Sequence, residues 1–251
     1  AMIPLVLAFA CLGFGVAESV VERSAQKAFA KGGLALVLGL AFGFVAYQVA
    51  NGIYGMGGDL LHDASASSLS AWLLRGFSWV VFGIAAGLIY GIIGQSGKKC
   101  LYGCLGGGLG AFLGGLLFNP IVDLTGGAEA SRAIGFIVLG GATGISMGLV
   151  ESALKDRWLH VISGPLAGKQ FILYKDETLI GSHSKSDIYL FKDSAVDQTH
   201  AIIALSGANM VLRAKGETRV GGQIVREKTL ASGDRIEIGQ YGFRYEEKNK
   251  A

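Results

Sequence analysis

Few side chains in this sequence have the types and spacing that catalysis or metal binding requires. Cys100 and Cys104 lie one helical turn apart, but no histidine or third cysteine accompanies them, so we interpret both as small packing residues. The segment from Gly55 to Asp63 offers two aspartates and His62, too few ligands for a metal, and predicts a polar loop or a short interfacial helix. We find no paired nucleophile and base, and no phosphate-binding glycine loop with its lysine. The sequence therefore predicts no catalytic residue, no metal ion and no cofactor, and we expect the protein not to be an enzyme.

Two carboxylates occupy matching positions at the ends of apolar segments. Glu18 lies in the sequence Gly15-Val-Ala-Glu-Ser, and Glu151 lies in Gly148-Leu-Val-Glu-Ser. Contact with the membrane interface, or with Arg23 or Arg157, is the simplest role for them, although their repeated position leaves a paired function open. The middles of the apolar segments contain no Asp, Glu, Lys, Arg or His, which disfavours a transporter or channel subunit.

Glycines recur at every fourth position in three of the apolar segments. This spacing places the small residues on one face of a helix, where they let two helix backbones approach closely. It predicts tight packing of helices within the chain or, alternatively, a face that meets another molecule. The glycines are Gly83, Gly87 and Gly91, then Gly106, Gly110 and Gly114, then Gly140, Gly144 and Gly148.

The composition indicates an integral membrane protein. Hydrophobic residues make up 51% of the chain and charged residues only 16%, whereas about a quarter of an ordinary soluble domain is charged. Five apolar segments have about the twenty residues that cross a membrane as a helix, and they lack the polar face of a soluble bundle. The predicted spans are Ile3–Val21, Gly32–Gly52, Gly76–Ile93, Leu101–Val122 and Ala133–Val150.

The basic residues beside these spans predict the orientation of the chain. Alternate loops are rich in Lys and Arg, and such loops remain in the cytoplasm. The N-terminus is therefore expected outside and the C-terminal part in the cytoplasm. The cytoplasmic set is Arg23, Lys27, Lys31, Lys98, Lys99, Lys155 and Arg157, against Arg75 and Arg132 on the other side.

The membrane part contains weak internal repetition. Besides the Glu18 and Glu151 match, the segment Gly32–Gly39 resembles Gly107–Gly114. We interpret this as a helical hairpin used twice, with a fifth helix repeating the first half.

The pattern changes to short strands after the fifth span. Turn residues such as Gly164-Pro165 and Gly221-Gly222 separate them, which is typical of a β-sandwich. We predict two domains, a transmembrane helical bundle over residues 1–154 and an all-β domain over residues 155–251. The predicted strands are Leu159–Gly164, Gln170–Tyr174, Asp187–Leu190, Ala201–Leu205, Met210–Arg213 and Arg235–Gly239.

Between Trp158 and Glu247 a set of short motifs follows in a fixed order. They are Leu179–Gly181, Ser186–Leu190, Val196 with His200, Thr218–Gly222, Leu230–Gly239 and Phe243. No single motif is specific, but in their order and spacing together they resemble the forkhead-associated (FHA) domain.

The resemblance implies a domain that reads phosphothreonine through loops at one end of the sandwich. The family pattern there is Gly-Arg, Ser-x-x-His and Asn-Gly. In this sequence Ser182 replaces the arginine, Asp197 replaces the serine, and Gly216-Glu217 replaces Asn-Gly. Phosphate favours arginine forks and unopposed donors, so these changes disfavour it.

The resemblance also implies which residues contact a partner. His200, which buttresses a loop in the family, Gly181 and Gly222 are expected to be structural. The expected partner-binding residues are Ser182, His183, Ser184, Lys185, Asp197, Gln198, Thr199, Gly216 and Glu217.

These features predict a membrane-anchored scaffold or complex subunit that docks a cytoplasmic protein without requiring phosphate. Its bundle is expected to meet other membrane subunits or itself, in a bacterial inner membrane, and nothing indicates nucleic-acid binding. Two alternatives remain open. One is a phosphothreonine-reading adaptor that works with a Ser/Thr kinase, and the other is a small transporter or channel subunit with an FHA-like regulatory domain.

Overall fold

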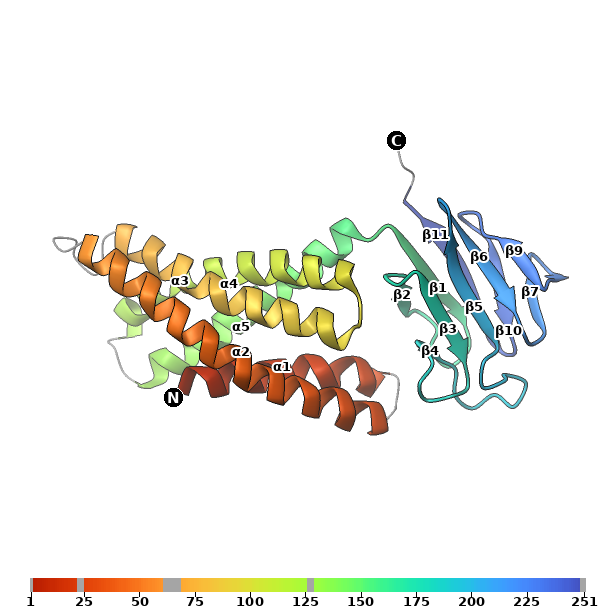
Figure 1. The fold of residues 1–251 in the computed structure, drawn as a ribbon, viewed down its shortest axis with the longest axis horizontal. Helices are drawn as coiled ribbons and strands as arrows, with labels where there is room; N and C mark the ends of the chain where they lie inside the picture. Colours follow the sequence, from red (N-terminus) through yellow and green to blue (C-terminus); the bar gives the residue numbers. More distant parts are fainter. Residues whose placement is uncertain (1, 22–24, 61–68, 126–128, 249–251) are drawn as a thin grey trace. The chain divides into compact units, whose positions relative to one another are not determined.

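The computed structural model describes residues 2–21, 25–60, 69–125 and 129–248 (Figure 1). The chain forms two compact units, Ala1–Leu154 and Lys155–Ala251. The first unit is helical and the second consists of β-strands. The helices are α1 (Met2–Val21), α2 (Ala25–Leu60), α3 (Leu69–Ile93), α4 (Gly97–Thr125) and α5 (Glu129–Leu154).

Four of the five helices are long and apolar enough to cross a membrane. They contain the candidate spans Ala25–Gly57, Leu69–Ile93, Gly97–Phe118 and Ala133–Leu154. The apolar part of α1, Met2–Ala17, is shorter than these spans. The prediction of five apolar helices is confirmed, and four of them satisfy the length of a full span by themselves.

The segment Gly55–Asp63, predicted as a polar loop or a short interfacial helix, is helical as far as Leu60. Helix α2 continues to Leu60, through the glycines after Gly55, and α3 already begins at Leu69. Because a backbone near lipid must satisfy its polar groups internally, the helix extends, and glycine does not stop it there. His62 and Asp63 of the predicted polar segment lie outside the described residues.

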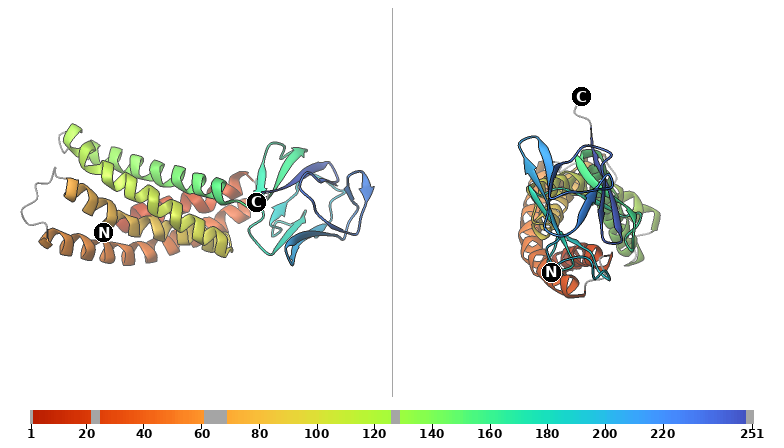
Figure 2. Two further views of the ribbon diagram at one scale, coloured as in Figure 1. Left: turned by 90° about the horizontal axis from the view of Figure 1, so that it is seen from above. Right: turned by 90° about the vertical axis from the view of Figure 1, so that its right-hand side faces the viewer.

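Glycines mark the contacts along α3, α4 and α5, which lie side by side (Figure 2). A Cβ added at Gly83 or Gly87 would overlap the α4 backbone at Gly107 or Gly103, and one added at Gly91 would overlap Cys100. On the next face of α4, Gly106, Gly110 and Gly114 contact Met147, Thr143 and Leu139 of α5. Six of the predicted packing glycines therefore lie where two helix backbones meet.

The third set of glycines, on α5, does not lie at a contact with another described helix. A Cβ added at Gly140, Gly144 or Gly148 would meet no described atom within 4 Å. Packing within the chain, the first alternative for these three residues, is therefore wrong for the described part. The physical reason is that α4 packs against the neighbouring face of α5, which carries Leu139, Thr143 and Met147.

The two helical hairpins use similar contacts. In the first, Gly15 of α1 lies against Lys31 and Ala35 of α2, and Gly39 lies against Ala8. In the second, Gly87 lies against Gly103. Antiparallel helix pairs with glycine at the contact thus occur in both places where the sequence suggested a repeat.

The β unit is a sandwich of two sheets. One sheet has the order β2-β1-β11-β10-β7-β8 and the other β4-β3-β5-β6-β9. Their facing side chains form one core, with Leu159, Ile203, Ile236 and Phe243 completely buried. The strands are β1 (Arg157–Ser163), β2 (Gln170–Ile172), β3 (Glu177–Gly181), β4 (Ile188–Tyr189), β5 (Ala201–Ser206), β6 (Asn209–Ala214), β7 (Thr218–Val220), β8 (Gln223–Ile224), β9 (Glu227–Thr229), β10 (Arg235–Ile238) and β11 (Tyr241–Glu247).

Candidate functional site

Three loops meet at one end of the sandwich, and we call residues 182–187, 191–200 and 215–217 the loop end. The strand register brings them together, because Ile180 pairs with Ala201 across β3 and β5, and Ala201 pairs with Ala214 across β5 and β6. All nine predicted partner-binding residues belong to these three loops. Residues far apart in the sequence therefore form one continuous surface.

Backbone hydrogen bonds join the first two loops. The Ser182 N–H donates to the Asp197 carbonyl at 2.9 Å, and the His183 N–H donates to the Gln198 carbonyl at 3.4 Å. Gly181 precedes them at the point of closest approach, where an added Cβ would overlap the Gln198 carbonyl oxygen. A side chain at position 181 would push the two loops apart.

His200 joins the second loop to the third. The side chain is 1% exposed, and its Nδ1 accepts a hydrogen bond from the Asp197 N–H at 3.1 Å. Its Nε2 lies 3.0 Å from the Glu217 carbonyl oxygen, so this nitrogen carries the proton and donates. The ring is therefore the neutral tautomer, and its 3.8 Å contact with the Asp197 carboxylate is not an ion pair.

Gly216 completes this arrangement because it lies over the His200 ring. A Cβ at position 216 would overlap the ring atoms Cε1 and Nδ1. The N–H groups of Lys215 and Gly216 both donate to the His200 carbonyl, at 2.8 and 3.0 Å. The position occupied by Asn-Gly in the FHA family is thus fixed here by contact with a buried imidazole.

The exposed chemistry of the loop end is polar with little net charge. Five of the predicted partner-binding residues are exposed, namely His183, Lys185, Asp197, Gln198 and Glu217, and the neighbouring Lys192 and Lys215 are exposed as well. The Glu217 carboxylate pairs with Arg219 at 2.9 Å, so that arginine is already engaged. The half-buried hydroxyl residues beside them are Ser182, Ser184 and Thr199.

Two residues that shape this surface were not predicted. The Asp187 carboxylate accepts a hydrogen bond from the Leu179 N–H at 2.8 Å and pairs with Lys175 at 2.8 Å, which anchors the end of the first loop. Arg219 balances Glu217 from the neighbouring strand. The pairing of Asp187 with Lys175 joins residues that are twelve positions apart, so the sequence gives no signal for it. Arg219 follows Glu217 by only two residues, and that pair was not among the predictions from the sequence.

Gly222 lies away from the loop end, in the turn between β7 and β8. Gly221 and Gly222 have φ values of +60° and +83°, and Val220 pairs with Gln223 around them. This left-handed pair is the geometry of a two-residue hairpin turn, which favours glycine at both positions.

Glu151 of the helical unit contacts another helix. The Tyr90 hydroxyl donates to both Glu151 carboxylate oxygens, at 3.2 and 3.3 Å, a partner that the sequence did not indicate. The Lys99 ammonium lies 4.3 Å from the centre of the Tyr90 ring. The Glu18 side chain lies outside the described part. Within the described ranges, no group of three His, Cys, Asp or Glu residues is arranged to hold a metal ion.

Comparisons with known proteins concern the C-terminal unit. Residues 160–249 match the family Yop-YscD, described as the cytoplasmic domain of the inner membrane component of T3SS. A curated relative, the oxoglutarate dehydrogenase inhibitor of Corynebacterium jeikeium, is 34% identical over 86 residues, which are 33% of this chain and 59% of that protein. The chain thus spans less than two thirds of the length of this relative.

Solved FHA domains are also similar to this part of the chain. One, from a study of phosphothreonine-dependent FHA interactions, is 23% identical, covers 38% of this chain and 99% of its own, and has a TM-score of 0.35. Another, from a Chlamydia trachomatis protein, is 21% identical, covers 38% and 99%, and has a TM-score of 0.34. The C-terminal part of this chain is an FHA-like domain that matches the family of cytoplasmic domains of T3SS inner membrane components.

Proposed function

We propose that this protein is a scaffold subunit of a bacterial inner membrane, and that its cytoplasmic FHA-like domain docks a protein partner through the loop end without requiring phosphate. The family match to an inner membrane component and the four candidate spans support a membrane-bound interaction protein. The docking surface and its independence of phosphate rest on the loop end itself.

The charged groups at the loop end support docking without phosphate. Ser182 stands where a phosphate reader needs a bidentate arginine, and the exposed Asp197 and Glu217 carboxylates would face an incoming dianion. The N–H groups of Ser182 and His183 already donate to carbonyls of the second loop. A neutral protein surface with amide and hydroxyl groups fits these loops better than a phosphate does.

The connection between the two units suits a fixed platform. Helix α5 ends at Leu154 and β1 begins at Arg157, so only Lys155 and Asp156 separate them. A link this short gives the FHA-like domain little reach. This favours a subunit that holds a partner within an assembly over an adaptor that searches the cytoplasm.

The test uses the full-length protein in detergent micelles. A photo-crosslinking residue at Gln198 identifies the partner in cells, and binding of that partner is then measured with and without phosphatase treatment. Combined His183→Ala, Lys185→Ala and Gln198→Ala substitutions should weaken binding at least tenfold, about 1.4 kcal/mol. A matched Ser206→Ala and Asn209→Ala variant, in the turn at the opposite end of the β5–β6 hairpin, should bind normally.

The alternative is a phosphothreonine reader, which the hydroxyls of Ser182, Ser184 and Thr199 and the nearby Lys185 and Lys215 favour. Under that alternative, phosphatase treatment abolishes binding. Our proposal predicts that phosphatase changes nothing. If the turn variant lost binding while the loop-end variant kept it, the docking surface would lie elsewhere on the sandwich.

A further inference from the structure

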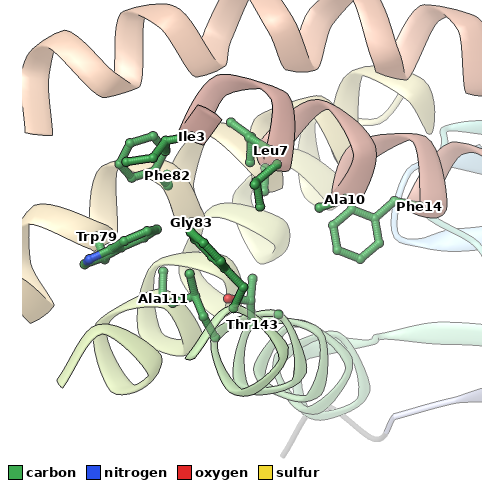
Figure 3. A pocket seen from close by; sticks show the side chains of 14 residues that line it. Ile3, Leu7, Ala10, Phe14, Trp79, Phe82, Gly83, Ala111 and Thr143 are labelled. Atoms are coloured by element: carbon green, nitrogen blue, oxygen red, sulfur yellow. The ribbon is translucent and has the colours of Figure 1, made fainter. Parts of the chain in front are cut away.

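An apolar cavity of about 110 Å³ lies within the helical unit (Figure 3). Side chains of α1, α3 and α5 form its walls, and Ala111 of α4 contributes to its lining. Four of the lining side chains are aromatic, namely Phe14, Trp79, Phe82 and Phe136. Trp79 contacts both Phe82 and Phe136, with ring centroids 5.2 and 6.1 Å apart.

Thr143 is the polar side chain of this cavity. The residue is 8% exposed, it lines the cavity, and its hydroxyl makes no hydrogen bond to any described residue. It lies in the middle of the candidate span Ala133–Leu154, where water does not offer an alternative partner. The hydroxyl is therefore available to donate to an occupant of the cavity that brings a hydrogen-bond acceptor.

One wall of the cavity is open at Gly140. This residue lines the cavity, and a Cβ built on it would meet no described atom within 4 Å. The corresponding glycines of α3, in the same four-residue spacing, are covered by α4. The glycine face of α5 therefore leaves space through which a flexible chain can extend.

The volume and the lining of the cavity restrict which molecules can bind in it. An engineered protein cavity of about 150 Å³ accepts benzene, and this cavity is smaller, at about 110 Å³, so the enclosed part of an occupant can be no larger than a single small ring. Flat rings pack favourably against aromatic side chains. A lipid acyl chain would leave the Thr143 hydroxyl unpaired, and a helix of a second chain is too wide to enter.

We propose that this cavity binds a membrane-dissolved molecule composed of a planar, carbonyl-bearing ring and an apolar tail. The ring packs among Trp79, Phe82 and Phe136, and a ring carbonyl accepts a hydrogen bond from Thr143. The tail passes Gly140. This binding is independent of the docking function of the FHA-like domain.

The experiment measures Trp79 fluorescence in the full-length protein in micelles, with Trp72→Phe and Trp158→Phe removing the other indoles. Neither replaced indole N–H has a hydrogen-bond partner among the described residues, so phenylalanine is a mild change. The probe is an alkyl-1,4-benzoquinone, and an alkylbenzene with the same tail serves as a competitor. We expect saturable quenching of Trp79 by the quinone, and about tenfold weaker competition by the alkylbenzene.

Two substitutions provide the decisive comparison. Thr143→Val keeps the shape but removes the hydroxyl, and should weaken quinone binding about tenfold, whereas Gly140→Leu should block it. Ser78→Ala is the matched control, because this buried hydroxyl of α3 donates to the Leu74 carbonyl and does not line the cavity. Thermal unfolding of each variant distinguishes lost binding from lost folding.

Three results would overturn the proposal. The first is non-saturable quenching that is identical in all variants, which indicates simple partition into the micelle. The second is equal affinity for quinone and alkylbenzene with no effect of Thr143→Val, which indicates an acyl-chain groove. The third is a dimeric protein in which Trp79 is inaccessible to either probe, which indicates that a second copy covers this face.

Discussion

Gly216 lies directly against the His200 ring at the loop end, where an added Cβ would overlap ring atoms. No left-handed φ is found at Gly216, so its backbone conformation is open to other residues and only the space above the ring excludes them. His200 is fully enclosed and holds the backbone of Asp197 and Glu217. Any group added at position 216 must displace either the ring or the loop.

Gly216→Ala is therefore expected to destabilise the FHA-like domain by about 1–3 kcal/mol, the usual cost of overpacking a filled site. Urea unfolding followed by Trp158 fluorescence, in a Trp72→Phe and Trp79→Phe background, measures this. Lys215→Ala is the control, since that exposed neighbour can lose its side chain without filling any space. Equal stability of both variants would contradict this prediction, because it would show that the loop moves to accommodate the added methyl group.

The buried tyrosines of β11 predict how the stability of the domain depends on pH. Burial raises the pKa of Tyr245, and the hydrogen bond from its hydroxyl to Glu247 raises the pKa further. Burial and the nearby Asp193 also raise the pKa of Tyr241. Both phenols keep their protons in the folded domain at a pH where unfolded tyrosine, with a pKa of about 10, loses them.

Stability should therefore be unaffected by these groups below about pH 10, and should fall as the pH rises above that value, by up to about 1.4 kcal/mol per pH unit for each tyrosine. Tyr245→Phe should cost about 1 kcal/mol at neutral pH, through the lost hydrogen bond, but should reduce this alkaline slope. Urea unfolding at several pH values between 8 and 11 measures both effects. An unchanged slope in Tyr245→Phe and Tyr241→Phe would contradict the assignment.

Single residues of the site could be predicted only where a motif marks them. The positions of Ser182, Asp197 and His200 follow from the order of the FHA-like motifs, and the strands bring these residues together. Asp187 could not be predicted, because its partner Lys175 lies twelve residues away on another loop. The partner-binding role of the loop end stays a prediction.

At the scale of elements, the contact between α3 and α4 depends on glycine. At Gly87 an added Cβ would overlap the backbone of Gly103, which cannot move without separating the helices. In lipid, close van der Waals packing rather than the hydrophobic effect holds helices together. The separation of α3 from α4 would therefore remove the main stabilising contact of that hairpin.

Gly87→Leu should accordingly lower the thermal unfolding temperature of the helical unit and destabilise it by about 3 kcal/mol. Gly148→Leu is the matched control, because an added side chain there meets no described atom. Circular dichroism at the helical signal, with the protein in micelles, compares the two. Similar unfolding temperatures would mean that the α3–α4 contact is not a close backbone contact.

The helices and most strands were predictable because their signals are local. Apolar length marks the helices, while alternation and turn residues mark the strands. The elements that were not predicted depend on their surroundings in the folded protein. Helix α2 continues past Gly55 because glycine is tolerated in helices that lie in lipid. Strands β3, β7, β8, β9 and β11 were not predicted. Of these, β8 and β9 are short strands at the edges of their sheets, and β11 carries charged residues beside its buried Tyr241, Phe243 and Tyr245.

At the scale of the whole molecule, the proposed function depends on which side of the membrane the FHA-like domain occupies. The prediction rests on Lys and Arg in alternate connections, including Lys27 and Lys31 at the start of α2, and Lys98 and Lys99 at the start of α4. Connections rich in these residues stay on the cytoplasmic side during insertion. The same charges lie toward the end of the bundle from which α5 leads into β1.

Cysteine labelling in intact cells tests this orientation. In a background with Cys11, Cys100 and Cys104 replaced by alanine, His62→Cys should react with a membrane-impermeant maleimide added outside. Gln223→Cys, on the exposed β8 strand, should react only after the membrane is opened. If Gln223→Cys reacted in intact cells, the loop end would face away from the cytoplasm. Docking of a cytoplasmic partner would then be impossible, whereas binding of a membrane-dissolved ring in the helical unit would be unaffected. The orientation thus separates the two proposals, because only one of them needs the cytoplasm.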